Sequence, residues 1–321
     1  MSKNVIITGG MGFIGHHLAR YYLDMGFRVT IIDDLLYHES HPRLTRYRME
    51  YLDDKRITFI QKNCSMTFSI KDQLKNSSNL PRSIIHLAGY PNQASVKVNE
   101  YNAVSTMSAN TLAMTELCKF YNCRMVYVSS SMAYGNFTQT PQSEKVELNP
   151  VNLYGLLKAQ GEELVRLMHP NSVIVRPSAV YGPGDTRDRV LAKWISAALK
   201  NEDILVRDPS SLLDFTHVED LVKGIAQAEE LGTAGHAYNL TYGQGRSLGE
   251  VSLLIKTLTD SKSFIDYFID YGDSVKDSNE PQRGALDIQK AYAHLRYRPR
   301  VDLISGVKSY IKWMQNYSHV Y

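Results

Sequence analysis

An apolar run near the start of the chain leads directly into three glycines, Gly9, Gly12 and Gly15, spaced three residues apart. Residues 4–8 are typical of a buried strand, and residues 12–25 are typical of a helix. In this order of strand, turn and helix, the first glycine permits the tight turn and the second lets a pyrophosphate approach the backbone. The third allows the helix to pack closely on the strand. Because a helix N-terminus also offers free N–H groups to phosphate, the pattern predicts a dinucleotide-binding turn.

The second predicted strand, Val29–Asp33, ends in an acid eighteen residues after Gly15. A carboxylate at that place accepts hydrogen bonds from the adenosine ribose hydroxyls and disfavours a 2′-phosphate. We therefore expect NAD rather than NADP as the cofactor. The alternative is a Rossmann-like fold with a vacant or nucleotide-only pocket.

Composition excludes several other classes of protein. The 321 residues are 43% hydrophobic and 21% charged, which is ordinary for a globular protein, and the net charge is only +3. That charge is too small to favour nucleic acid or a membrane surface as a partner. Three cysteines without regular spacing argue against a disulfide framework or a metal site. No signal peptide and no membrane-spanning run is expected, so a cytoplasmic location is the simplest expectation.

Strand-like and helix-like segments alternate through the first half of the chain. This alternation indicates an α/β fold of Rossmann type, with a doubly wound parallel sheet covered on both faces. The predicted strands are Asn4–Thr8, Val29–Asp33, Ile57–Gln61, Ser83–Leu87, Met125–Ser129 and Val173–Arg176. The predicted helices between them are Gly12–Met25, Ile70–Lys75, Val104–Tyr121 and Leu153–Met168.

Two stretches depart from this alternation. Residues 37–55 are rich in His, Arg and Tyr and are expected to form a solvated loop, the alternative being an insertion that packs near the adenosine. Beyond Arg176, prolines and glycines break the pattern, and we expect a smaller C-terminal region at the carboxyl edge of the sheet, where such folds bind ligands. Its predicted helices are Val190–Lys200, Leu248–Thr259 and Ile304–Tyr317.

A second motif carries chemistry. Tyr154 and Lys158 lie four residues apart in a predicted helix and share one face. An ammonium near a phenol lowers the pKa of the phenol, so the tyrosine can take a proton from a sugar or alcohol hydroxyl while hydride leaves the carbon. A strand that runs into Ser129–Ser131 places a hydroxyl where the nicotinamide should lie.

Taken together, these segments resemble the extended short-chain dehydrogenase/reductase family, the nucleotide-sugar epimerases and dehydratases, over nearly the whole chain. The ordered motifs are Thr8–Gly15, His86–Gly89, Asn110, Ser129–Gly135, Tyr154–Lys158, Arg176–Pro183 and Asp214–Asp220. The resemblance implies an NAD-binding Rossmann domain of residues 1–176, to which residues 213–240 return. Residues 177–212 and 241–321 would form the substrate-binding region.

The resemblance also implies residue roles. Tyr154 is the acid/base, Ser130 is the hydroxyl that bonds the reacting oxygen and Tyr154, and Lys158 holds the nicotinamide ribose. Ser131 contacts substrate or nicotinamide, and Asn63 bonds the adenine amino group. The full set of implied cofactor-binding residues is Gly9, Gly12, Phe13, Ile14, Gly15, Asp33, Asp34, Asn63, Cys64, Leu87, Ala88, Gly89, Asn110, Tyr154 and Lys158.

Departures from the family pattern concern the reaction and the substrate. Family dehydratases and decarboxylases carry an acid just after the catalytic hydroxyl, where this chain has Ser131 and Met132. Methionine has no proton to give, which argues against 4,6-dehydration. Ala179 and Leu213 replace an asparagine and an arginine that often hold the substrate diphosphate. Because arginine binds phosphate bidentately, the candidate replacements are Arg187, Arg189, Arg246 and Arg283, and we select Arg187, Arg189 and Arg283.

The sequence therefore predicts an NAD-dependent epimerase of a sugar, expected to be nucleotide-linked, in which the cofactor stays bound. The first alternative is an NAD(P)-dependent keto-sugar reductase or sugar dehydrogenase, which the same residues would serve. The second is a non-catalytic protein that senses NAD. From the family, we also expect a homodimer that pairs the helices Val104–Tyr121 and Leu153–Met168.

Overall fold

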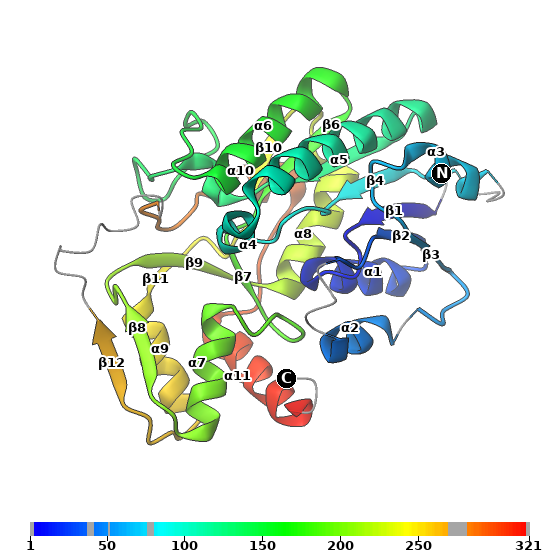
Figure 1. Ribbon diagram of the computed structural model, residues 1–321. Helices are drawn as coiled ribbons and strands as arrows, with labels where there is room; N and C mark the ends of the chain where they lie inside the picture. The colour runs from blue at the N-terminus through cyan, green and yellow to red at the C-terminus, as the bar shows by residue number, and fades with distance from the viewer. Residues whose placement is uncertain (1–2, 37–41, 51, 76–79, 269–280, 319–321) are drawn as a thin grey trace.

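A seven-stranded parallel sheet forms the centre of the protein in the computed structural model, which describes residues 3–36, 42–50, 52–75, 80–268 and 281–318 (Figure 1). Its strand order is β10-β6-β5-β4-β1-β2-β3, and every neighbouring pair is parallel. The order 3-2-1-4-5-6 is that of the Rossmann fold. The strands are β1 (Asn4–Thr8), β2 (Arg28–Asp33), β3 (Ile57–Gln61), β4 (Ser83–His86), β5 (Arg124–Val128), β6 (Ser172–Arg176) and β10 (Ala237–Asn239).

Helices cover both faces of this sheet, as the alternating pattern predicts (Figure 1). Val5 and Ile7 of β1 belong to a buried cluster with residues of α1 (Phe13–Asp24) and α8 (Val218–Leu231). Ile6 points the other way, into a cluster with residues of α3 (Thr67–Leu74), α5 (Glu100–Tyr121) and α6 (Leu153–Met168). Strand β1 therefore carries apolar side chains on both faces, which is typical of a parallel sheet between two helical layers.

The C-terminal region forms a second buried cluster around two small sheets. A three-stranded sheet has the order β11-β9-β7 and a two-stranded sheet pairs β12 with β8. Tyr181, Trp194, Phe215 and Trp313 share this cluster. The elements of this region are β7 (Ala179–Tyr181), α7 (Val190–Lys200), β8 (Ile204–Arg207), β9 (Leu212–His217), β11 (Gly245–Ser247), α9 (Leu248–Leu258), β12 (Ile265–Phe268) and α11 (Leu303–Asn316). Helix α10 (Gln289–Leu295) instead buries Ala291 and Leu295 in the cluster of the central sheet. The division into two domains at the stated residues stays a prediction.

The expectation of a solvated loop over residues 37–55 is wrong for residues 42–49. Residues Pro42–Met49 form helix α2, while 37–41 and 51 lie outside the described residues. Arg48 is only 1% exposed, and its Nη2 donates to the carbonyl of Gly184 at 2.8 Å. Its Nη1 donates to the carbonyl of Met11 at 3.4 Å, inside the glycine turn. The segment is thus an inserted helix that ties the glycine turn to the loop after β7.

A second element that the sequence analysis omits is the short helix α4 (Gln93–Val98), which is followed at once by α5. Asn92 caps α4, because its Oδ1 accepts from Ser95 N at 2.8 Å while Ser95 Oγ donates to the Asn92 carbonyl. Asn99 caps α5 by accepting from Asn102 N at 3.0 Å. The Asn99 cap starts α5 at Glu100, four residues before the predicted Val104.

Candidate active site

The glycine turn has the geometry that a dinucleotide needs. Gly9 has φ +66°. A Cβ there would lie 2.9 Å from Ala88 N, in the loop after the neighbouring strand β4. A Cβ on Gly15 would lie 2.1 Å from the Gly9 carbonyl, so only glycine allows this close packing. Gly12 is the N-cap of α1 and has no side chain to bond the first-turn N–H groups. The positive end of α1 therefore faces the space that a pyrophosphate would fill.

Asp33 ends β2 beside this turn. Its Oδ2 accepts from Met11 N and its Oδ1 accepts from Leu35 N, both at 2.9 Å. The side chain is almost buried, and burial raises the pKa of the carboxyl above its ordinary value. Since each carboxylate oxygen has a further lone pair, two ribose hydroxyls can still donate to Asp33.

Three further residues of the expected adenosine site lie near the end of β2. Asn63 Nδ2 donates to Asp34 Oδ2 at 2.8 Å. Asn63 Oδ1 accepts from Ser65 N at 3.1 Å and from Ser65 Oγ at 2.7 Å, so an adenine amino group would have to replace one of these bonds. Cys64 is buried, and burial raises the pKa of its thiol to about 12, which keeps it neutral.

The nicotinamide side of the expected site lies beyond β4. Thr8 Oγ1 accepts from Leu87 N at 3.2 Å and from Ala88 N at 3.1 Å, which fixes the loop that contains Gly89. Asn110 of α5 is 4% exposed, and its Oδ1 has no hydrogen-bond partner among the described residues. An orphaned buried acceptor is costly unless a ligand donates to it. Together with the glycine turn and Asp33, it shows that these residues fit a bound NAD.

The candidate catalytic side chains come together at the N-terminus of α6. Tyr154 lies in the first turn, which Asn152 caps by accepting from Gly155 N at 2.8 Å. Ser130, two residues after the end of β5, makes a side-chain hydrogen bond with Tyr154. Lys158 lies one turn further along, and its Nζ donates to the carbonyl of Val128 at 2.9 Å. The predicted meeting of Ser130, Tyr154 and Lys158 is thus found in the structure.

The electrostatics of Tyr154 differ from the expectation. The spacing of Tyr154 and Lys158 predicts a phenol whose pKa the lysine lowers, whereas burial raises the pKa of Tyr154 above its ordinary value. The positive charge that opposes this rise is that of Arg189, followed by the hydrogen bond from Ser130. Lys158 Nζ lies 5.9 Å from the Tyr154 ring centre, and burial lowers the pKa of the ammonium to about 8. Desolvation is therefore the largest influence on the pKa of each of these two side chains.

A buried ion pair supports this helix and was missed by the sequence analysis. Glu162 lies four residues after Lys158 and is fully buried. Its carboxylate accepts from Ser129 Oγ at 2.6 Å and from Arg176 Nε and Nη2 at 2.8 and 2.6 Å. The signal was present, because Tyr154, Lys158 and Glu162 recur at four-residue intervals on one helix face.

The expected substrate residues are more scattered. Ser131 is buried, and its Oγ donates to Ser178 Oγ at 3.3 Å. Arg187 is exposed, while Arg189 Nη2 donates to the Pro91 carbonyl at 3.3 Å. Arg283 is half-buried in the segment before α10. Of these arginines, Arg189 is the one whose charge acts on the pKa of Tyr154.

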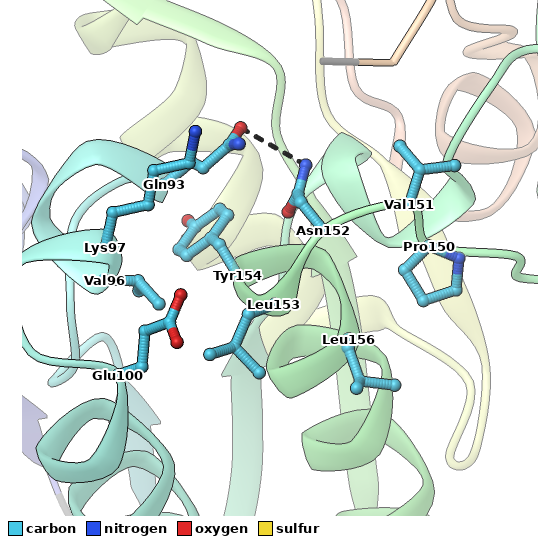
Figure 2. A pocket seen from close by; sticks show the side chains of 10 residues that line it. All are labelled: Gln93, Val96, Lys97, Glu100, Pro150, Val151, Asn152, Leu153, Tyr154 and Leu156. Carbon is cyan, nitrogen blue, oxygen red and sulfur yellow. Dashed lines mark hydrogen bonds between the residues drawn. The ribbon is translucent and has the colours of Figure 1, made fainter. Parts of the chain in front are cut away.

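A cavity of about 430 Å³ opens beside Tyr154, between α4, the start of α5 and the start of α6 (Figure 2). Figure 2 shows the Tyr154 ring between α4 and α6, with the hydrogen bond between Gln93 and Asn152 drawn above it. Asn152 Nδ2 donates to Gln93 Oε1 at 3.3 Å. The cavity is lined by Gln93, Val96, Lys97, Glu100, Pro150, Val151, Asn152, Leu153, Tyr154 and Leu156.

Within the described residues, no group of three or more His, Cys, Asp or Glu side chains is placed to hold a metal ion. None of the helices within residues 3–36, 42–50, 52–75, 80–268 and 281–318 combines the length and apolar character that a bilayer crossing requires.

The fold and the site define a Rossmann-type enzyme with a Ser, Tyr and Lys centre, and comparison with known proteins gives its family. Residues 5–241 match the NAD dependent epimerase/dehydratase family. The chain is 28% identical over 321 residues to a Bacillus subtilis (strain 168) protein named "Uncharacterized UDP-glucose epimerase YtcB", with 97% of this chain and 98% of that protein covered. It is 24% identical over 323 residues to the dTDP-glucose 4,6-dehydratase of Actinoplanes sp. (strain ATCC 31044 / CBS 674.73 / SE50/110), with 96% and 97% covered.

Among solved structures, the fold is similar to that of the UDP-glucuronic acid 4-epimerase from Bacillus cereus, solved in complex with UDP-glucuronic acid and NAD. The TM-score is 0.86 at 24% sequence identity, and 98% of this chain and 99% of that chain are covered. The chain belongs to the NAD-dependent epimerase/dehydratase family of extended short-chain dehydrogenases/reductases. It is an enzyme with NAD as its cofactor, as the sequence predicts.

Proposed function

We propose that this enzyme is an epimerase of a nucleotide-linked sugar and that it does not dehydrate its substrate. The observation that carries the proposal is the packing at position 132. Met132 and Tyr154 belong to one buried apolar cluster with Leu157 and Met107. A thioether therefore occupies the place where a family dehydratase has an acid, and it has no proton to donate to a leaving hydroxyl.

The proposed chemistry assigns one task to each side chain. Tyr154 takes the proton of the reacting sugar hydroxyl and later returns one to the keto oxygen. Ser130 hydrogen-bonds both that oxygen and Tyr154, which keeps the proton path short. NAD held by the glycine turn and Asp33 would supply reversible hydride transfer at the sugar carbon, and inversion requires that the keto sugar present its other face before it is reduced. Lys158 orients the nicotinamide ribose from the same helix face.

The proposal includes the substrate and cofactor contacts expected from the sequence. Asp33 with the glycine turn selects NAD, and Ser131 contacts the sugar. Arg187, Arg189 and Arg283 remain the proposed ligands of a substrate diphosphate, in place of the family residues replaced by Ala179 and Leu213. A buried diphosphate without such donors would be costly.

A homodimer through α5 and α6 is also part of the proposal. Support comes from large apolar side chains exposed on these helices, namely Val104, Leu112, Phe120, Leu156 and Leu167. A cytoplasmic location stays a prediction.

The experiment that tests the function is incubation with a panel of nucleotide sugars, with and without added NAD, followed by NMR analysis of product stereochemistry. We expect one sugar to interconvert with an epimer without added NAD, because the cofactor is regenerated in each turnover. Product that forms only in proportion to added nicotinamide cofactor would instead identify the reductase or dehydrogenase. Absence of any sugar conversion, with NAD bound, would favour the non-catalytic sensor.

A further inference from the structure

The end of β5 carries the groups that meet the catalytic helix. Tyr154 of α6 makes a side-chain hydrogen bond with Ser130, and Lys158 Nζ donates to the carbonyl of Val128 at 2.9 Å. Because β5 and α6 are separate elements, both contacts depend on how the end of the strand lies against the helix. A displacement of about 1 Å would take either contact outside hydrogen-bond distance.

Ser129 stands between these two residues of β5 and makes a third contact with the helix. Its Oγ donates to Glu162 Oε1 at 2.6 Å. Glu162 lies one turn after Lys158, on the same face of α6. Residues 128, 129 and 130 are therefore each in contact with a different turn of α6.

Glu162 is itself firmly held. Its carboxylate accepts from Arg176 Nε and Nη2 at 2.8 and 2.6 Å, and from Arg166 Nη2 at 3.1 Å. The side chains of Arg176 and Glu162 are 3% and 0% exposed, and a pair of parallel bonds between such groups fixes their geometry. Arg176 ends β6, which pairs with β5, so the carboxylate is anchored to the sheet as well as to the helix.

We propose that the hydrogen bond between Ser129 and Glu162 positions the end of β5 against α6 and thereby maintains both contacts of the catalytic helix with that strand end. Ser129 and Glu162 are positioning residues, which act through Ser130 and Lys158. The bond suits this task because a hydrogen bond to an ionised carboxylate is shorter and stronger than one between neutral groups. The inference rests on the proposed function, since Tyr154 is the acid/base of the same site.

The test compares two substitutions of buried serines that both contact α6. Ser129→Ala removes the donor, while Glu162 keeps both arginines, so no buried charge is left unpaired. The matched control is Ser172→Ala. Ser172 of β6 is 0% exposed, and its Oγ bonds the carbonyl of Val165 near the other end of α6 at 3.5 Å. Ser129→Thr keeps a hydroxyl at the same place and should restore the wild-type behaviour.

Two readouts separate positioning from stability. The first is kcat per mole of bound NAD, with KM, for the nucleotide sugar that the wild type converts. We expect roughly tenfold lower kcat in Ser129→Ala with little change in KM, because misplaced reacting groups slow the reaction more than they loosen binding. The second is NAD affinity, measured by titration of cofactor-free protein. It should be weaker in Ser129→Ala, because Lys158 is proposed to hold the nicotinamide ribose. Ser172→Ala should match the wild type in both.

Each result decides between roles. Equal turnover per bound NAD and equal NAD affinity in Ser129→Ala and Ser172→Ala would overturn the inference and leave Ser129 a role in stability alone. A raised KM with unchanged kcat in Ser129→Ala would also overturn it. Should Ser129→Ala fail to fold, Ser129→Cys, whose thiol is only a weak donor, decides in its place. A wild type that converts no sugar refutes the proposed function, and the NAD titration still tests the positioning role.

Discussion

Met132 and Tyr154 share one buried apolar cluster at the start of α6. Because Met132 comes two residues after Ser130, a thioether stands where dehydration would need a proton donor. We therefore predict that incubation with dTDP-glucose, UDP-glucose, UDP-N-acetylglucosamine or GDP-mannose yields no 4-keto-6-deoxy sugar. The alkali-induced absorbance of such a product would show that another group supplies the proton.

Replacement of the proposed base should abolish most of the turnover. Tyr154→Phe removes the phenolic hydroxyl but keeps the ring that packs against Met132, so the fold and the bound cofactor should be retained. We expect turnover to fall roughly 10²–10⁴-fold. Tyr267→Phe, at an exposed position of β12, is the control and should be fully active. Near-normal turnover in Tyr154→Phe would exclude the phenol as the acid/base.

Cofactor choice should depend on Asp33. Asp33→Ser removes the charge that repels a 2′-phosphate, and it also weakens the bonds to Met11 N and Leu35 N. We predict weaker binding of NAD and a smaller advantage of NAD over NADP, measured by titration of cofactor-free protein. The interpretation of Asp33 is wrong if the wild type already binds NADP more tightly than NAD.

Arg48 should stabilise both the fold and the cofactor turn. Arg48→Met keeps much of the buried stem but leaves the carbonyls of Gly184 and Met11 without their donor. We expect a loss of about 2–4 kcal/mol in the free energy of unfolding, together with easier loss of cofactor. Arg46→Met, on the exposed side of the same helix, is the matched control. Equal unfolding midpoints for the two variants would contradict this role.

Local patterns predicted the central sheet well. The strand Ile57–Gln61 and the helices Leu153–Met168 and Val190–Lys200 have the predicted bounds. The spacing of apolar residues within each of these segments is enough to predict whether it forms a strand or a helix. The glycine turn and the Ser130, Tyr154 and Lys158 centre were likewise recognisable, because motif spacing reflects backbone geometry that recurs in this fold.

Contacts between distant segments could not be predicted in this way. Arg48 is buried because it meets the Gly184 carbonyl 136 residues away, so a segment rich in charge was interpreted as a solvated loop. The raised pKa of Tyr154 was missed because burial, which sequence spacing does not report, outweighs the nearby charges.

The central claim is that hydride leaves one sugar carbon and returns to the same carbon within a single binding event. The most direct test uses the converted nucleotide sugar with deuterium at the inverted carbon, mixed with unlabelled substrate, and follows both isomers by NMR and mass spectrometry. The account predicts that deuterium stays at that carbon through inversion, without added NAD and without exchange between molecules. Deuterium found at C6, in added cofactor or lost to solvent would contradict it.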